Sequence, residues 1–125
     1  MEIAQTRIQV QLDQVTAERA GKPKWIESLI RIVNLVSNSD SGGASALAPL
    51  LMSCYNGSEY PFDITELCRL DDEYFEDALN LIRLRTRCGH EPHEFFVLGG
   101  KLFEQIAADF GIHAECDRAN PSRKS

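Results

Sequence analysis

The sequence predicts an all-α fold, a compact bundle of about five to six helices. Apolar residues recur at three- and four-residue spacing along several segments, which is the period of an amphipathic helix. The same segments are bounded by aspartates that cap helix starts and by glycines that end helices. The chain has 125 residues, of which 43% are hydrophobic, and this suits one domain with its own core.

The clearest helix covers residues 24–37 and should lie at the centre of the bundle. Its apolar residues cover most of the circumference, and Glu27, Arg31 and Asn34 form only a narrow polar stripe. So wide an apolar surface is typical of a helix packed on several sides. Trp25 is the only tryptophan, and we expect it to pack in the core, with stacking on a ligand as the alternative.

Two further helices are expected between residues 45 and 70. The first covers 45–55, and it tolerates Pro49 only near its first turn, because proline removes a backbone donor. The second covers 64–70, where Asp63 is the N-cap and Glu66 its capping partner.

A longer helix is predicted over residues 72–88, capped by Asp71 and ended by Gly89. Its buried face should consist of Phe75, Ala78, Leu79 and Ile82. Pro92 can then open another helix at its first position. The Gly99-Gly100 pair is expected to interrupt that helix before the apolar pattern resumes over 101–110.

The N-terminal segment fits two patterns. Ile8, Val10 and Leu12 alternate as in a strand, whereas Ile8, Leu12 and Val15 also share one helical face. Because glutamine, alanine and glutamate favour helix, we predict a helix over 3–19.

The chain is therefore divided into three parts. Residues 1–23 form an N-terminal extension at the periphery, residues 24–112 form the helical domain, and residues 113–125 form a flexible C-terminal tail.

The net charge of −6 is concentrated in one block. Residues 59–77 hold eight acids and one base, and residues 78–89 hold three arginines and no acid. This balance argues against a nucleic-acid binder, which normally carries a basic stripe for phosphates. Arg83 and Arg87 lie on the same side of the predicted helix as the acids, whereas Arg85 points elsewhere.

The acids at the start of helix 72–88 have no base three or four residues downstream. The pairs Asp72–Glu76 and Glu73–Asp77 are like-charged at a spacing of four, which mildly destabilises a helix. A favourable interaction with the helix dipole accounts for the first turn but not for this density. We therefore assign binding of a basic protein partner to Glu66, Asp71, Asp72, Glu73, Glu76 and Asp77.

Residues that could carry chemistry occur in two clusters. Cys88, His90 and His93 offer zinc ligands, and His113 with Cys116 offers two more, but neither spacing matches a standard finger. A cysteine–histidine nucleophile, Cys88 with His90, is a second alternative.

Glu91, His93 and Glu94 could transfer protons, but the sequence places no second catalytic group beside them. The standard phosphate-binding and hydrolase motifs are missing from the sequence. We therefore predict no enzyme activity, no metal and no cofactor.

The sequence also shows no membrane-spanning segment and no signal peptide. No run approaches the ~20 apolar residues of a membrane span, and the first residues lack the layout of a signal peptide. We expect a cytoplasmic protein whose four cysteines are reduced.

An ordered set of motifs resembles a family of small uncharacterised proteins carried on bacterial plasmids and integrative elements. The motifs are Ser39-Asp40-Ser41-Gly42, Asn56, Phe62-Asp63-Ile64-Thr65-Glu66-Leu67, Leu70-Asp71, and Gly100 with Phe103-Glu104. The resemblance covers residues 24–112 and brings no catalytic residues. It implies a mobile-element setting, in which small acidic proteins often bind host machinery. Anti-CRISPR proteins, which inhibit a nucleic-acid-directed defence complex, are one such class.

The sequence thus favours a non-enzymatic protein-binding module of a mobile genetic element. Its partner would be a basic protein surface, for example on a host nucleic-acid-binding complex, with no direct contact to nucleic acid or membrane. Two alternatives stay open: a small metal-supported or Cys–His enzyme, and a structural accessory subunit.

Overall fold

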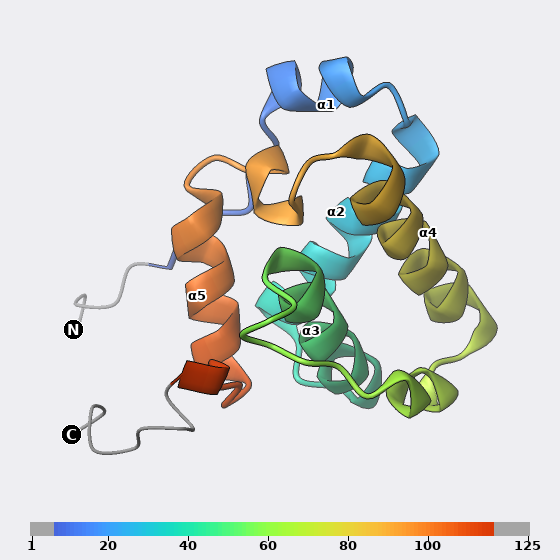
Figure 1. The fold of residues 1–125 in the computed structure, drawn as a ribbon, viewed down its shortest axis with the longest axis vertical. Helices are drawn as coiled ribbons and strands as arrows, with labels where there is room; N and C mark the ends of the chain where they lie inside the picture. Colours follow the sequence, from blue (N-terminus) through green and yellow to red (C-terminus); the bar gives the residue numbers. More distant parts are fainter. Residues whose placement is uncertain (1–6, 117–125) are drawn as a thin grey trace.

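The computed structural model describes residues 7–116, and within them the fold is all-α, as predicted (Figure 1). It has five α-helices and two short 3₁₀ helices. In chain order they are α1 (Gln14–Ala20), α2 (Pro23–Asn38), α3 (Gly42–Tyr55), η1 (Ile64–Arg69), α4 (Asp72–Cys88), η2 (Pro92–Phe95) and α5 (Gly99–Asp109). None of these helices is long and apolar enough to cross a membrane.

Helix α2 is the central element, and the helix predicted at 24–37 is confirmed with one more residue at each end. It packs most extensively against α4 and also against α3. Leu29, Ile32 and Val33 are fully buried in the core that these helices share with η2 and α5. Trp25 differs from the expectation of a core residue. It is half-buried at the edge of the core, with the Lys22 Nζ atom 5.2 Å from the ring centroid.

Helix α3 begins three residues earlier than predicted, at Gly42. The Ser41 hydroxyl caps it by accepting a hydrogen bond from the Ala44 N–H at 3.2 Å. Pro49 therefore lies in the interior of the helix, and the expectation that it lies near the first turn is wrong. Burial of Leu47 and Leu51 on either side of Pro49 stabilises the helix through packing, which outweighs the loss of one backbone hydrogen bond.

Helix α4 has the predicted bounds, with the Asp71 carboxylate as N-cap and Gly89 in the left-handed conformation (φ 73°) at its end. Its buried face is different from the predicted one. Asp77, Ala78, Leu81 and Leu84 are buried, whereas Phe75 is 37% exposed and Leu79 only half-buried. The predicted face is thus correct at Ala78 and in part at Ile82, which is half-buried against the core, and the helix is turned so that Asp77 faces α2.

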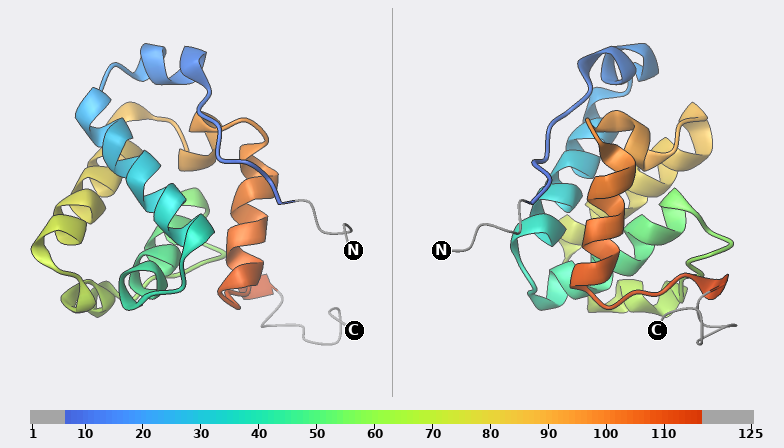
Figure 2. Two further views of the ribbon diagram at one scale, coloured as in Figure 1. Left: turned by 180° about the vertical axis from the view of Figure 1, so that it is seen from behind. Right: turned by 90° about the vertical axis from the view of Figure 1, so that its left-hand side faces the viewer.

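The N-terminal segment is helical only from Gln14 onward, so the helix predicted over 3–19 is wrong for residues 7–13, and residues 1–6 lie outside the described part. Residues 7–13 are extended and run beside α5 (Figure 2). The Asp13 N–H donates to the Phe95 carbonyl at 2.7 Å, and the Val97 N–H donates to the Gln11 carbonyl at 2.8 Å.

These two bonds flank an isolated antiparallel bridge between Leu12 and Phe96. Ile8, Val10 and Leu12 pack against the core, which explains their strand-like alternation. Residues 7–23 of the extension are therefore part of the packed fold and not peripheral to it.

The C-terminal third also differs in detail. The helix expected to open at Pro92 is the short η2, and Gly99 and Gly100 begin α5 instead of interrupting a helix. Beyond α5, the Glu115 N–H donates to the Glu59 carbonyl at 2.7 Å, so residues up to 116 are attached to the loop after α3. The rest of the predicted tail, 117–125, lies outside the described residues.

Candidate functional site

The acids assigned to partner binding lie on η1 and the first two turns of α4, and the structure separates them by environment. Glu66 forms an ion pair with Arg69 at 2.8 Å on the surface of η1. The Asp71 Oδ1 atom accepts a hydrogen bond from the Tyr74 N–H at 2.9 Å as the cap of α4. Both side chains therefore have local structural roles, although Asp71 remains exposed.

Asp77 does not belong to an accessible surface, and its assignment to partner binding is wrong. Its side chain is only 3% exposed. The Ser28 Oγ–H donates to Oδ1 at 2.7 Å, and the Arg31 guanidinium donates from Nη2 to Oδ1 at 2.6 Å and from Nε to Oδ2 at 3.0 Å. The hydrogen bonds to this carboxylate raise the pKa of Arg31 above its ordinary value. Asp77 thus joins α4 to α2.

The remaining acids form an exposed surface on α4. Asp72, Glu73 and Glu76 are exposed, and the side chains of Asp72 and Glu76 form no hydrogen bond or ion pair with any residue in the range 7–116. Phe75 follows Asp72 by three positions, so its exposed ring lies one helical turn from Asp72, beside these acids on the surface of the helix. We call Asp72, Glu73, Phe75 and Glu76 the acidic face of α4.

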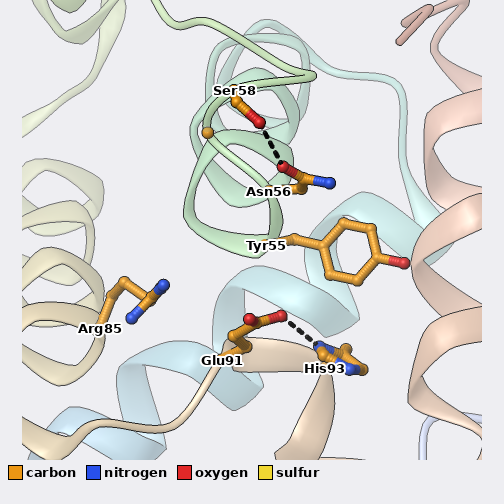
Figure 3. Close-up of a pocket in the computed structure, with 7 residues that line it drawn as sticks. Tyr55, Asn56, Ser58, Arg85, Glu91 and His93 are labelled. Carbon is orange, nitrogen blue, oxygen red and sulfur yellow. Dashed lines mark hydrogen bonds and ion pairs between the residues drawn. The ribbon is translucent and has the colours of Figure 1, made fainter.

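A second feature is a polar pocket with a volume of about 440 Å³ (Figure 3). It lies where the end of α3, the turn after it, α4 and the start of η2 meet. Every residue that lines it is polar or glycine. The lining residues are Tyr55, Asn56, Gly57, Ser58, Arg85, Glu91 and His93.

Two charged side chains of opposite sign line the polar pocket. The Arg85 Nε–H donates to the Cys54 carbonyl at 2.9 Å, at the C-terminal end of α3. Glu91 is the residue directly before η2, and its backbone N–H donates to the Glu94 carboxylate at 3.2 Å. Arg85 and Glu91 belong to different elements, and both extend toward the pocket in Figure 3.

Aromatic rings form the side of the polar pocket nearest to α5. The Tyr55 ring packs edge-on against the His93 ring, with 4.9 Å between centroids, and also packs against Phe103. Burial raises the pKa of the Tyr55 hydroxyl, and the carboxylates of Glu104 and Glu91 raise it further. His93 Nδ1 is buried without a hydrogen bond, and the nearest acidic oxygen, on Glu91, is 3.6 Å away.

The residues considered for zinc binding are not brought together. Within residues 7–116, no three histidine, cysteine, aspartate or glutamate side chains are placed to hold one metal ion. The His90 Nδ1 atom instead contacts the Glu94 carboxylate at 3.0 Å. This hydrogen bond lowers the pKa of Glu94.

The proton-transfer set is also divided, because Glu94 pairs with His90 while Glu91 lies near His93. Cys54 adjoins the polar pocket, because its carbonyl accepts the hydrogen bond from Arg85. Burial raises the pKa of its thiol to about 11, so it is protonated at neutral pH.

The sequence did not point to Tyr55, Asn56 or Arg85 as site residues. Arg85 follows the adjacent Tyr55 and Asn56 by about thirty positions, so only the fold brings it beside them. One signal was present: Arg85 points away from the acids with which Arg83 and Arg87 share a side of the helix.

Comparison with known proteins identifies the class. The chain matches a family of unknown function (DUF7673) over residues 26–111, and it belongs to this family. The matched region includes both the acidic face and the polar pocket. The match carries no information about plasmids or integrative elements. No curated protein and no solved structure matches the chain.

Proposed function

We propose that the chain is a non-enzymatic protein-binding module that uses the acidic face of α4 to dock on a basic protein surface. The observation that supports this most strongly is the pair of exposed carboxylates, Asp72 and Glu76, which have no ion-pair partner among residues 7–116 and lie beside the exposed Phe75. Contacts within the fold account for Asp77, Glu66 and Asp71. The helix dipole favours Asp72 in the first turn of α4, but no contact among the described residues accounts for Glu76.

The acidic face combines the two contributions that a protein interface needs. Carboxylates speed the association with a basic surface and disfavour acidic partners. An aromatic side chain supplies apolar contact area, and aromatic residues are enriched among those that dominate binding energy. Phe75 is 37% exposed, so part of its side chain is available for a partner to cover.

The partner class that we propose is a host nucleic-acid-directed defence complex, inhibited in the manner of an anti-CRISPR protein. Such complexes contain basic grooves for phosphates, and an acidic protein surface can occupy them. This part of the proposal, with a mobile-element origin and a cytoplasmic location, rests on the motif resemblance and on the charge of residues 59–77.

The test compares two variants with the same net charge. The first replaces Asp72, Glu73 and Glu76 with lysine, and the control replaces the exposed Glu18, Asp40 and Glu104 with lysine. Tagged wild-type and variant proteins are used to capture partners from a bacterial lysate at low and high salt, followed by mass spectrometry. We expect a salt-sensitive partner that the control retains and the first variant loses, while both keep their circular-dichroism melts.

Equal capture by the two variants would show that the acidic face is not the binding surface. Phe75→Ala provides an independent measurement, since it leaves every charge in place and should still weaken capture. A stable homo-oligomer in light scattering, unchanged by all three variants, would favour a structural accessory subunit instead.

A further inference from the structure

We propose that the polar pocket binds a small zwitterion, a free α-amino acid with a polar side chain. The inference starts from two opposite charges that face one cavity. Arg85 extends toward it from α4, and Glu91 extends toward it from its position directly before η2 (Figure 3). No ion pair forms between them, although each could neutralise the other at closer range.

Both charged groups still have free capacity. Arg85 uses Nε to bond the Cys54 carbonyl, and its two terminal amino groups have no acceptor among residues 7–116. The Glu91 carboxylate approaches His93 Nδ1 at 3.6 Å, and the Glu91 backbone N–H donates to the Glu94 carboxylate at 3.2 Å. The Arg85 side chain is therefore held by a backbone contact before any ligand arrives, which lowers the cost of binding.

The chemistry of the two groups defines the ligand. A guanidinium presents a planar fork of donors that matches a carboxylate, and a glutamate carboxylate accepts hydrogen bonds from an ammonium group. A simple anion on Arg85 would face Glu91, and a simple cation on Glu91 would face Arg85. A molecule that carries both charges satisfies both residues, and an α-amino acid is the smallest common compound of this kind.

The remaining lining favours a polar side chain on the ligand. The backbone N–H groups of Gly57 and Ser58 donate to no acceptor among the described residues, so they are available at the turn after α3. The side-chain oxygen Oδ1 of Asn56 already accepts from the Ser58 hydroxyl at 3.1 Å, which leaves the Asn56 side-chain NH₂ as a further donor. A volume of about 440 Å³ falls within the usual range for small-molecule sites.

The experiment titrates the full chain with each of the twenty L-amino acids, monitored by amide chemical shifts in NMR. We expect at least one polar amino acid to shift the amides of residues 56–58, 85 and 91–93. The strongest binder is then compared with its decarboxylated amine and its deaminated acid. For L-glutamine these are 4-aminobutanamide and glutaramate, and each should bind at least about tenfold more weakly.

Two variants test whether the charges of Glu91 and Arg85 bind the ligand. Glu91→Gln keeps the size of the side chain but removes its charge, and it should weaken binding of the amino acid about tenfold or more, as should Arg85→Gln. Arg83→Gln is the control, because Arg83 is on the same helix but contacts Asn80 and lies outside the polar pocket. If Arg85→Gln fails to fold because the bond to the Cys54 carbonyl is lost, Glu91→Gln still tests the proposal.

Several results would overturn the zwitterion site. They are the absence of shifts at the pocket with all twenty amino acids, equal binding of an analogue that lacks one charge, and unchanged affinity in Glu91→Gln. The outcome is independent of partner capture by the acidic face, since the lysine variants of Asp72, Glu73 and Glu76 leave the polar pocket intact.

Discussion

Asp77 and Asp72 are on the same helix but have opposite surroundings. Asp77 is buried and accepts hydrogen bonds from Ser28 and Arg31, whereas Asp72 is exposed and forms no ion pair in the described range. Asn80 adds to the buried network by donating to the Ser28 hydroxyl at 3.0 Å. The network stabilises the contact between α2 and α4, and its energy depends on the single carboxylate at its centre.

Asp77→Asn should lower the free energy of unfolding by about 1–3 kcal/mol, because the amide keeps the shape but loses the charge that Arg31 and Ser28 require. Asp72→Asn is the matched control, and it should change the stability by less than about 0.5 kcal/mol. Urea denaturation followed by circular dichroism measures both. Equal midpoints would contradict the role of Asp77 in joining the two helices.

The caps at Asp63, Asp71 and Gly89 could be predicted from the sequence because each acts on its own turn. Asp77 could not, since its partners Ser28 and Arg31 are 49 and 46 residues away in the chain. The polar pocket was missed for the same reason: Tyr55 and Arg85 become neighbours only when α3 packs on α4. The acidic block was visible, but its division into buried and exposed acids depends on the rotation of α4.

At the scale of elements, the start of α5 shows why a glycine pair predicted as an interruption can begin a helix. Leu98 precedes the pair in the left-handed conformation (φ 55°), and the chain turns there from η2 into α5. A Cβ atom at Gly99 would overlap the carbonyl oxygen of His93, so the close approach of η2 to α5 requires glycine. No atom lies within 4 Å of a Cβ atom at Gly100.

The two glycines should therefore respond to alanine in opposite directions. Gly99→Ala should destabilise the protein by about 1–3 kcal/mol, because η2 must move away from α5. Gly100→Ala should raise the stability by up to about 1 kcal/mol, because alanine has the higher helix propensity. Thermal and urea unfolding of the two single variants measure this difference, and destabilisation of similar size in both would contradict the contact with His93.

At the scale of the whole molecule, the extended segment 7–13 joins the N-terminus to the second half of the fold. The family match begins at residue 26, so this segment is outside the matched region although it packs against the same core. Its hydrogen bonds reach Phe95 and Val97, and Arg7 forms an ion pair with Asp109 at the end of α5. The segment is thus attached to η2 and α5. Glu91, which lines the polar pocket, is the residue directly before η2.

Leu12→Ala should lower the free energy of unfolding by about 1–3 kcal/mol, since the half-buried leucine packs on the core and pairs with Phe96. Gln11→Ala is the control, because the Gln11 side chain is exposed and its backbone carbonyl, which binds Val97, is retained. In hydrogen exchange, the amides of Asp13 and Val97 should exchange faster in Leu12→Ala than expected from the global loss of stability. If they exchange no faster than the amides of α2, the segment does not open as a separate unit. If Leu12→Ala is as stable as Gln11→Ala, the segment is peripheral after all.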